Sequence, residues 1–243
     1  VGYELQHSLA VLGNVIALER SQLDLLDAAA IRRVVREIKP NLIVNPAAYT
    51  AVDKAESEPE LAMTINAVAP GVLAEEAARL DIPLVHYSTD YVYDGAKSSP
   101  YVETDSTNPL NVYGKSKLAG ENAIRAVGLP HLILRTSWVY GARGKNFLRT
   151  ILRLAAEREQ LRVVSDQIGA PSWSRSIAEA TLVALNNWNE GLSGTYHLTC
   201  AGQTSWHEFA QEIVKEYEMR YESRDWPKFR AKVAGIEAIK TAE

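Results

Sequence analysis

The stretch LVHYSTDYVYDG at residues 84–95, followed by NVYGKSK at residues 111–117, decides the fold of this 243-residue chain. The first stretch begins as an apolar run typical of a buried strand and ends in hydroxyl and carboxyl side chains. The second opens a run at residues 113–127 that is rich in Ala, Leu, Lys and Glu, and therefore predicts a helix. A strand that ends in polar groups and leads to a helix is typical of an α/β protein whose ligand lies beyond the strand ends.

Tyr113 and Lys117 are the residues of this stretch best suited to acid–base chemistry. Four residues apart on a helix, they lie on one face, about 6 Å apart along its axis. A phenol has an ordinary pKa of about 10, and a nearby ammonium group would lower that pKa toward the range useful for general acid catalysis. Thr89, at the predicted strand end, would donate a hydrogen bond to the same substrate oxygen. We therefore expect these three residues to move a proton onto a carbonyl oxygen.

Spacing alone is a weak argument, because Tyr93 and Lys97 are also four residues apart. That second pair crosses Asp94-Gly95-Ala96, which favours a turn, so its two side chains need not share a face. The Tyr113 pair instead opens a helical run and follows the polar strand end at residues 88–90. This combination favours a catalytic role for the Tyr113 pair.

Composition excludes several classes of function. A net charge of −4, with 47% hydrophobic and 23% charged residues, is ordinary for a globular protein and gives no reason to expect nucleic acid or an anionic membrane as partner. The single cysteine, Cys200, fits a reducing compartment and is expected to be a buried thiol in a strand. No signal peptide or apolar run of spanning length is visible, which predicts a cytoplasmic protein. The histidines show no spacing typical of a metal site.

The alternation of expected elements indicates the architecture. Helices are expected at residues 28–39, 58–80 (as one helix or two joined near 69–71) and 113–127, and strands at residues 41–45, 84–87 and 131–136. This order predicts an α/β fold with a doubly wound parallel sheet of Rossmann-like type. Residues 47–50, 88–90 and 136–140 follow expected strands, at the edge where such sheets bind ligands.

The pattern loosens beyond residue 140. Helices are expected at residues 145–158, 176–188 and 205–217, and strands at residues 161–164 and 194–198. We expect residues 1–140 to form a dinucleotide-binding domain. Residues 141–243 would form mostly a smaller α/β cap that binds substrate, with some segments returning to the sheet.

The first residues show an incomplete nucleotide-binding pattern. Leu5, Leu9 and Leu12 are spaced as on a helix, and residues 14–18 are expected to form a strand that ends in Glu19-Arg20. An acidic residue there commonly binds ribose hydroxyls and an adjacent Arg serves a 2′-phosphate, although such a pair is more often solvated surface. Gly2 lies where the last glycine of a phosphate-binding loop would fall. Because the strand and glycines that precede such a helix are not in the sequence, we expect the natural chain to extend before residue 1. We expect it to extend beyond residue 243 as well, because residues 240–243 end without an evident final element.

Several motifs together resemble one family. The STDYVY and YGKSK segments are similar to those of the extended short-chain dehydrogenase/reductases that act on nucleotide sugars, and most closely to the dTDP-4-dehydrorhamnose reductase family. NPAAYTAVDKAE at residues 45–56 is similar to that family's NAAAYTAVDKAE, with Pro46 as the departure. RTSWVY at 135–140, the pair Asn146-Phe147 and DQIGAP at 166–171 also match. The resemblance covers nearly the whole chain.

The resemblance implies a reaction and its site. NADPH or NADH would reduce the C4 ketone of a dTDP-linked 4-keto-6-deoxy sugar, giving dTDP-L-rhamnose for cell-surface polysaccharide. The resemblance leaves open whether a structural Mg²⁺ is bound and whether the protein is a monomer or a homodimer. Tyr113 would protonate the alkoxide while Lys117 lowers the pKa of Tyr113 and holds the nicotinamide ribose. Residues expected to line the cofactor are Gly2, Glu19, Arg20, Asp24, Leu25, Ala47, Ala48, Thr50, Tyr91, Tyr113 and Lys117. Residues expected to meet the substrate are Thr89, Asp90, Trp138 and Asn146.

Alternatives come from relatives and from another class. Nucleotide-sugar dehydratases carry a catalytic Glu after the Ser/Thr-Asp pair, where this chain has Tyr91, so elimination chemistry is disfavoured. Other nucleotide-sugar reductases or epimerases stay open. A non-catalytic regulatory subunit of Rossmann-like fold is the alternative from another class, favoured by the missing glycine loop and disfavoured by the intact Thr89, Tyr113 and Lys117.

Overall fold

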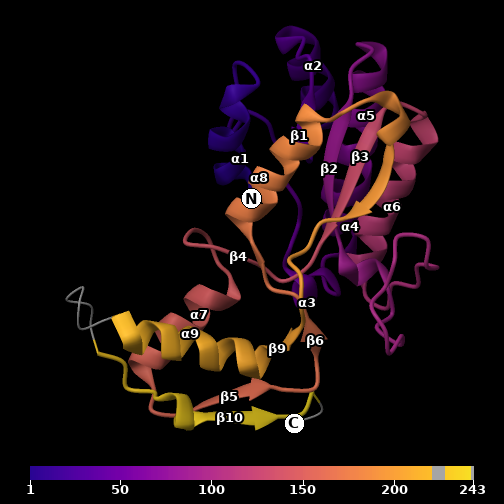
Figure 1. The fold of residues 1–243 in the computed structure, drawn as a ribbon. Coiled ribbons are helices and arrows are strands. Elements are labelled where there is room, and N and C mark those ends of the chain that lie inside the picture. Colours follow the sequence, from indigo (N-terminus) through magenta and orange to yellow (C-terminus); the bar gives the residue numbers. More distant parts are fainter. Residues whose placement is uncertain (221–227, 242–243) are drawn as a thin grey trace. The chain divides into compact units, whose positions relative to one another are not determined.

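The computed structural model describes residues 1–220 and 228–241, which form two compact units (Figure 1). Unit 1 comprises residues 1–136 and 178–198, and unit 2 comprises residues 137–177 and 199–243. Residues 242–243, part of the tail in which no final element is expected, lie outside the described residues. No helix in the described ranges is both long and apolar enough to cross a membrane.

Unit 1 is built on a four-stranded parallel sheet in the order β1-β2-β3-β8. The strands are β1 (Ile43–Asn45), β2 (Leu84–Thr89), β3 (His131–Thr136) and β8 (Gly194–His197). Asn45 is in register with His86, and Thr89 with Thr136, so these strand ends meet at one edge of the sheet. The predicted doubly wound parallel sheet of Rossmann-like type is confirmed.

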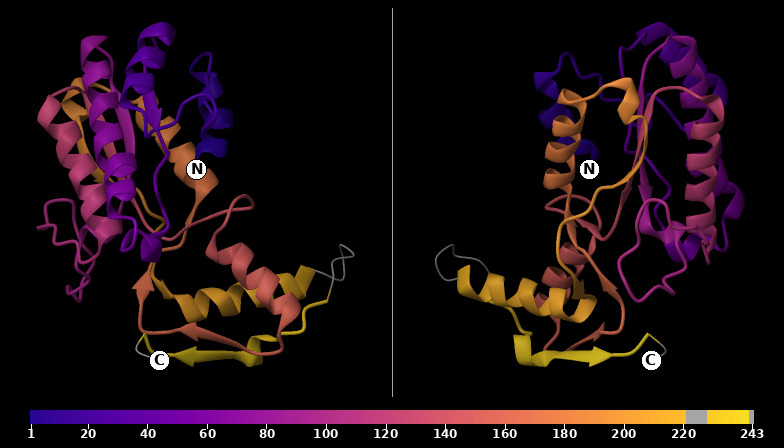
Figure 2. Two further views of the ribbon diagram at one scale, coloured as in Figure 1. Left: turned by 180° about the vertical axis from the view of Figure 1, so that it is seen from behind. Right: turned by 45° about the vertical axis from the view of Figure 1, so that its right-hand side comes forward.

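Helices cover both faces of this sheet. Figure 2 shows α5 (Ala69–Arg79) and α6 (Val112–Val127) on one face and α8 (Ser174–Asn186) on the other, while α2 (Ala28–Ile38) packs beside α5. Alternate residues of β2 serve the two faces: Leu84 packs in the cluster that contains Ile124 of α6, whereas the Tyr87 hydroxyl bonds to Thr181 of α8 at 2.6 Å. The period of two explains why all six residues of β2 are buried.

The helical stretch at 58–80 is continuous but contains an irregular turn just before the expected junction at residues 69–71. It runs from α4 (Pro59–Met63) through a π-helical turn, η2 (Thr64–Val68), into α5. The irregularity lies where α6 comes closest, because a Cβ added at Gly120 would be 2.1 Å from the Asn66 carbonyl oxygen. Because α5 begins at Ala69, the junction lies where it was expected, near Ala69-Pro70-Gly71. Pro70 is tolerated there because the π-helical turn has already changed the backbone hydrogen bonding.

The N-terminal region differs from expectation in one element. The predicted helix is present as α1 (Gly2–Ser8) and the 3₁₀ turn η1 (Leu9–Val11), with Leu5 and Leu9 buried. The strand predicted at 14–18 is wrong: the segment is irregular and Ile16 is 54% exposed. A strand forms only when a neighbouring strand takes up its backbone hydrogen bonds, and within the described ranges none pairs with this segment. The smaller elements that complete unit 1 are α3 (Val52–Ala55), η3 (Asp90–Val92) and η4 (Glu190–Leu192).

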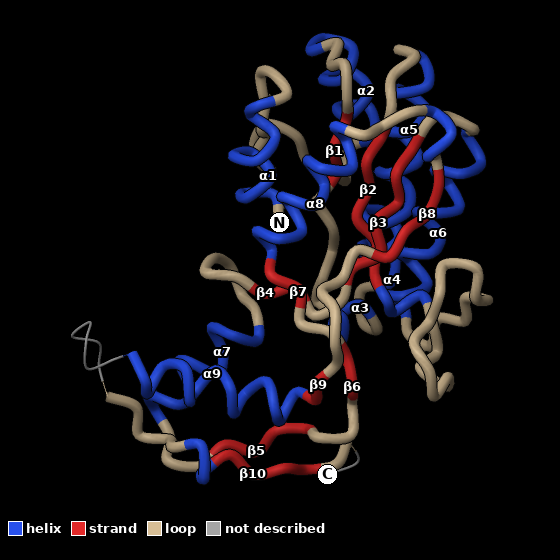
Figure 3. The backbone as a smooth tube through the Cα atoms, viewed as in Figure 1, coloured by secondary structure: helices blue, strands red, loops and turns tan. Residues whose placement is uncertain are grey.

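Unit 2 has its own core. Figure 3 shows the parallel pair β5 (Leu161–Val164) and β10 (Ile236–Ile239), with α7 (Phe147–Glu157) and α9 (Trp206–Arg220) packed on it. Its other elements are β4 (Val139–Tyr140), β6 (Ile168–Gly169), β7 (Ser172–Trp173), β9 (Thr204–Ser205) and η6 (Val233–Gly235). Cys200 follows β8 and is exposed, so the expectation of a buried strand thiol is wrong. The reason is that β8 ends at His197, three residues before the thiol.

Candidate active site

The start of α6 is fixed by two side chains. Asn111 is the N-cap, and its side-chain oxygen accepts from the Gly114 amide at 2.7 Å. Glu56 accepts a hydrogen bond from the Val112 amide at 2.8 Å. Both acceptors satisfy amide groups that a helix N-terminus otherwise leaves without partners. Together they set the position and direction of the turn that carries Tyr113.

Gly114 lets this turn approach the strand end that carries Thr89. A Cβ at Gly114 would be 2.2 Å from the Tyr91 carbonyl oxygen, so no larger residue fits. The rings of Tyr91 and Tyr113 meet edge to face, with centroids 5.5 Å apart at 78°. Tyr91 is 40% exposed while Tyr113 is buried. The expected juxtaposition of Thr89, Tyr91 and Tyr113 is therefore present in unit 1.

The Tyr113 hydroxyl is held in its protonated form. Burial raises its pKa to about 12, hydrogen bonding with Thr89 opposes that rise, and the charges of Asp90 and Tyr91 add to it. The net shift is upward, opposite to the net lowering expected from a nearby Lys117, because the ring is buried among apolar groups such as Ala55 and Ala62. A protonated phenol is the form that a general acid requires.

Lys117 is one of the most buried residues of unit 1, at 1% exposure. Its Nζ donates to the Tyr87 carbonyl oxygen at 2.6 Å and lies 3.1 Å from Nε2 of His86. Burial lowers its pKa to about 8, and the nearby carboxylate of Glu121 opposes this shift. Lys117 therefore titrates close to neutral pH, and Tyr87 and His86 engage only part of its hydrogen-bonding capacity.

Asp90 is a second group that titrates near neutral pH. Burial raises the pKa of its carboxyl to about 6, while hydrogen bonds from Thr89 and from backbone amides lower it. Thr89 donates to Asp90 at 3.0 Å and accepts from the Tyr91 amide at 3.2 Å. Thr89 thus lies between an acidic group and Tyr113.

The loop after β1 lies beside the start of the chain. Ala47 and Thr50 are exposed, Ala48 is partly buried, and Gly2 approaches Pro46 at ordinary contact distance, with its built Cβ 3.4 Å from Cγ. Small side chains here leave the backbone accessible, as contact with a cofactor would require. The structure thus places Gly2 next to the loop that contains Ala47, Ala48 and Thr50.

The remaining expected cofactor residues form a separate turn before α2. Arg20 pairs with Asp24 at 3.3 Å, and both side chains are well exposed. Glu19 accepts within the same turn, since its carbonyl bonds to the amides of Gln22 and Leu23. Leu25 packs against the cluster shared by α2 and α5. Because residues 14–18 form no strand, Glu19 and Arg20 do not stand at a strand end as predicted.

Two expected substrate residues belong to unit 2. Trp138 has a left-handed backbone with φ of 46° and stacks on Trp206, with ring centroids 3.4 Å apart. Gly169 permits this placement, because its built Cβ would be 2.4 Å from the indole. Asn146 caps α7 by accepting from Arg149 at 3.2 Å and donates to the Gly141 carbonyl at 2.9 Å. Their contact with substrate stays a prediction.

Sequence reasoning missed the buried polar residues behind the site. Spacing predicts only a core or surface role for His86, yet it contacts Lys117. Asn66, in the π-helical turn, accepts from the Tyr49 amide at 2.8 Å and donates to Ser116 at 2.9 Å, joining the loop after β1 to α6. The signal in the sequence was a polar Asn66 inside an otherwise apolar helical run. Asn66 lies in the π-helical turn, and such turns are frequent at functional sites.

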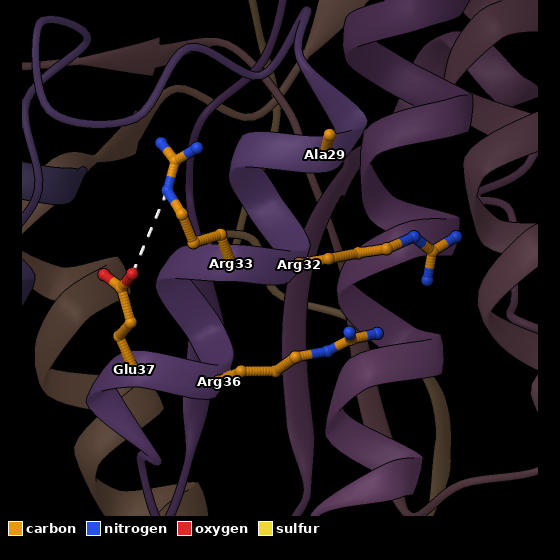
Figure 4. A pocket seen from close by; sticks show the side chains of 5 residues that line it. All are labelled: Ala29, Arg32, Arg33, Arg36 and Glu37. Atoms are coloured by element: carbon orange, nitrogen blue, oxygen red, sulfur yellow. Dashed lines mark ion pairs between the residues drawn. The ribbon is translucent and has the colours of Figure 1, made fainter.

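A surface pocket elsewhere on unit 1 is lined by Ala29, Arg32, Arg33, Arg36 and Glu37 of α2. Figure 4 shows Arg33 turned toward Glu37, while Arg32 and Arg36 extend away from that pair. Arg32 and Arg36 pair with the buried carboxylate of Glu76 on α5, at 3.1 and 2.7 Å. These ion pairs fasten α2 to α5. In the ranges 1–220 and 228–241, no group of three or more His, Cys, Asp or Glu side chains is arranged to hold a metal ion.

The fold and this site define the class: a Rossmann-like α/β protein with Thr, Tyr and Lys brought together at the carboxyl end of its sheet. The chain matches the family described as RmlD substrate binding domain over residues 1–243, and it belongs to that family.

Named relatives agree. The chain is 54% identical over 223 residues to the dTDP-4-dehydrorhamnose reductase of Burkholderia thailandensis, covering 89% of this chain and 75% of that protein. It is 47% identical over 224 residues to the protein of the same name from Escherichia coli K12, covering 89% and 74%. A crystal structure of dTDP-4-dehydrorhamnose reductase from Bacillus anthracis, in complex with NADP, is similar with a TM-score of 0.86 and 35% identity, over 99% of this chain and 80% of that one.

Proposed function

We propose that this chain is an NAD(P)H-dependent reductase that converts the C4 ketone of dTDP-4-dehydro-L-rhamnose to the alcohol of dTDP-L-rhamnose. The names of the Burkholderia and Escherichia relatives support this substrate, and the NADP in the Bacillus structure supports a nicotinamide cofactor. The observation that carries the proposal is the buried, protonated hydroxyl of Tyr113, which is hydrogen-bonded with Thr89 at the end of β2. Tyr113 lies on α6, the helix that also carries Lys117.

Proton delivery follows from this arrangement. As a hydride reaches the carbonyl carbon, the carbonyl oxygen becomes an alkoxide, and Tyr113 gives it the phenolic proton. The O–H bond of Tyr113 breaks and the O–H bond of the product forms. Thr89 would turn its hydroxyl hydrogen from Asp90 to the same oxygen and stabilise the charge that develops there. The buried position of Tyr113 keeps competing water away from the transfer.

The donor set fits a nicotinamide cofactor, which supplies the hydride when bound. Lys117 retains an N–H beyond the one directed at the Tyr87 carbonyl, as the ribose hydroxyls of such a cofactor require. Gly2, Ala47, Ala48, Thr50 and Tyr91 would line its path, and the turn of Glu19, Arg20, Asp24 and Leu25 would meet its adenosine end. Arg20 is exposed and pairs with the exposed side chain of Asp24 in the same turn, so it could exchange this partner for a 2′-phosphate, which favours NADPH over NADH.

Substrate recognition would use different chemistry in each unit. In unit 1, the strand-end Thr89 and Asp90 offer a hydroxyl and a carboxyl that suit the polar groups of a sugar. In unit 2, the indole of Trp138 suits stacking on a sugar or base. Because Asn146 is already a helix cap, we expect its loss to impair the stability of unit 2 as well as substrate binding.

The test follows the absorbance of reduced nicotinamide with dTDP-4-dehydro-L-rhamnose and purified protein. We expect oxidation of NADPH by the unaltered chain and a loss of at least about 100-fold in Tyr113→Phe, which removes the proton donor but keeps the ring. Tyr196→Phe is the matched control, because the Tyr196 hydroxyl bonds to the Leu192 carbonyl, outside the site. No oxidation by folded protein would contradict the proposal and favour a binding subunit.

A further inference from the structure

Behind the proposed catalytic residues lies a chain of three buried polar side chains. Asn45 of β1, His86 of β2 and Lys117 of α6 are 5%, 0% and 1% exposed. Nδ2 of Asn45 lies 3.1 Å from Nδ1 of His86, and Nε2 of His86 lies 3.1 Å from Nζ of Lys117. No solvent reaches the imidazole, so each of its nitrogens must be satisfied by these two neighbours.

The direction of the hydrogen bonds in this chain is set at Asn45. The Ala47 amide donates to Oδ1 of Asn45 at 3.2 Å, and a backbone N–H cannot act as an acceptor. The amide nitrogen of Asn45 therefore faces His86 as a donor, and Nδ1 of His86 must accept. A neutral imidazole carries one N–H, so its proton is on Nε2 and points at Lys117. Lys117 then accepts this bond through its lone pair.

The other groups around the Lys117 amine are consistent with a neutral amine. The Tyr87 carbonyl of β2 accepts one N–H at 2.6 Å. Glu121, one turn further along α6, is the carboxylate that favours charge on Lys117, but it is engaged by Arg135 at 2.7 Å and by Ser88. Tyr113, one turn earlier, is protonated and uncharged. Burial is the largest cause that lowers the pKa of His86 well below its ordinary value, so the imidazole itself stays neutral.

We propose that Asn45 and His86 are positioning residues that control the charge of Lys117: while Asn45 holds the Ala47 amide, Lys117 is an acceptor, and Lys117 can become an ammonium only when the Asn45 amide turns over. In the charged state Lys117 donates to Nε2, the imidazole proton moves to Nδ1, and Nδ1–H donates to Oδ1 of the reversed Asn45. The three hydrogen-bonded side chains then hold one more proton in total, which comes from the solvent.

This coupling reaches the loop after β1, because turnover of Asn45 releases the Ala47 amide. Its mechanistic meaning rests on the proposed function, in which Ala47 lines the cofactor path and Lys117 stands beside the acid Tyr113. A new acceptor for the Ala47 amide would favour the charged form of Lys117. Charging of Lys117 would in turn loosen the Ala47 contact.

The first test reads the imidazole directly and needs no turnover. In protein labelled with ¹⁵N-histidine, we expect the His86 signal, assigned by its loss in His86→Gln, to report a proton on Nε2 when the pH is well above the Lys117 pKa of about 8. Asn45→Asp should move the proton to Nδ1, because one carboxylate oxygen accepts from Nδ1–H and the other keeps the Ala47 amide. A proton on Nδ1 in the unaltered protein at that high pH would overturn the proposal, and that measurement stands even if Asn45→Asp fails to fold.

The second test separates the hydrogen-bond chain from simple charge. Asn45→Asp adds a negative charge and would raise the pKa of Lys117 in any case, so the variant is compared with His86→Gln and with the double variant by lysine ¹³Cε titration. We expect the shift caused by Asn45→Asp to be clearly smaller when residue 86 is Gln, since the imidazole transmits most of it. Equal shifts in both backgrounds would contradict a relay through His86.

Activity gives the link to function. If the proposed reductase activity is present, the pH profile of kcat should shift in Asn45→Asp and His86→Gln in the direction of the Lys117 titration. His131→Gln, altered at a histidine that bonds to the Leu129 carbonyl, should leave the profile unchanged. A protein without activity would sink the proposed function but leave the tautomer result standing, whereas unchanged pH profiles in active variants would refute the role of His86.

Discussion

At the scale of single residues, the site is defined by pKa values displaced in opposite directions. Burial raises the pKa of Tyr113 to about 12 and that of Asp90 to about 6, and lowers that of Lys117 to about 8. The common cause is desolvation, which disfavours the charged form of each group. Such shifts are frequent at functional sites, because a buried ionisable group costs stability that function must justify.

Asp90 allows a direct test of that cost. The folded pKa is raised above the ordinary 3.8, so its contribution to stability is full below pH 3.8 and is lost as pH rises through about 6. Asn resembles the protonated carboxyl, so Asp90→Asn should gain about 1 to 3 kcal/mol in the free energy of unfolding at neutral pH and little in acid. Urea unfolding at both pH values measures this.

The same change bears on Tyr113, because the charge of Asp90 raises its pKa. We expect the pKa of Tyr113 to fall in Asp90→Asn, which ultraviolet titration of the phenol would detect. An equal loss of stability at both pH values would show that the carboxylate is a structural acceptor rather than a desolvated charge.

At the scale of elements, α6 is the helix on which the site depends, and Gly120 sets its distance from the π-helical turn. Ala is favoured over Gly in a helix by about 1 kcal/mol, so a substitution governed by propensity would stabilise. A Cβ at residue 120 would however lie 2.1 Å from the Asn66 carbonyl oxygen, a backbone atom that cannot move aside. We expect Gly120→Ala to cost about 1 to 3 kcal/mol and to lower kcat, since Asn66 also holds Ser116 and Tyr49.

Gly71→Ala is the control on the neighbouring helix α5. Its built Cβ meets the Ala123 side chain at 3.2 Å, a milder approach to a methyl group. Chemical denaturation of both variants measures the comparison. If Gly120→Ala is as stable as the unaltered protein, close packing of α6 on the π-helical turn is not what requires glycine there.

Elements with strong local patterns were predictable from sequence, and those fixed by partners were not. The α2 and β3 segments follow their predicted ranges closely, because apolar spacing and the Pro40 stop are local signals. The segment 14–18 has the same apolar composition as a strand, but composition cannot reveal whether a neighbouring strand is present to pair with it. Likewise β10 was missed, since only its pairing with β5 makes residues 236–239 a strand.

The site was predictable where spacing carried the information and not where burial did. Tyr113, Lys117 and Thr89 come together because helix period and strand end are readable from the sequence. The net shift of the Tyr113 pKa was predicted with the wrong sign, because spacing along the helix does not reveal that the ring is buried against Ala55 and Ala62. His86 became a site residue only when its strand was placed against α6.

At the scale of the whole molecule, buried carboxylates join the layers of unit 1. Glu76 fastens α5 to α2, and the hydrogen bond from Arg36 leads in lowering its pKa to about 2. Glu121 fastens α6 to β3: burial raises its pKa, but hydrogen bonds from Arg135 and Ser88 outweigh burial and lower it. Both carboxylates are 0% exposed, so each depends on its partners for solvation.

Acid should therefore unfold unit 1 by protonating these groups. The folded pKa of Glu76 lies below its ordinary 4.5, so the stability it provides is full above pH 4.5 and is lost as pH falls toward 2. Glu76→Gln should lose about 2 kcal/mol at neutral pH, because arginine hydrogen bonds to a charged acceptor are replaced by weaker ones. The gap from the unaltered protein should close as pH falls through that window, where the unaltered carboxylate is itself protonated.

Glu75→Gln separates this effect from charge alone. Glu75 pairs with the same Arg32 at 2.6 Å, but its side chain is 51% exposed, so its loss should change stability by less than about 1 kcal/mol. Unfolding free energies from urea titrations across the acid range distinguish the two variants. Parallel curves for Glu76→Gln and the unaltered protein down to pH 2 would mean that protonation of Glu76 is not what destabilises unit 1 in acid, and would leave Glu121, which joins α6 to β3, as the buried carboxylate to test.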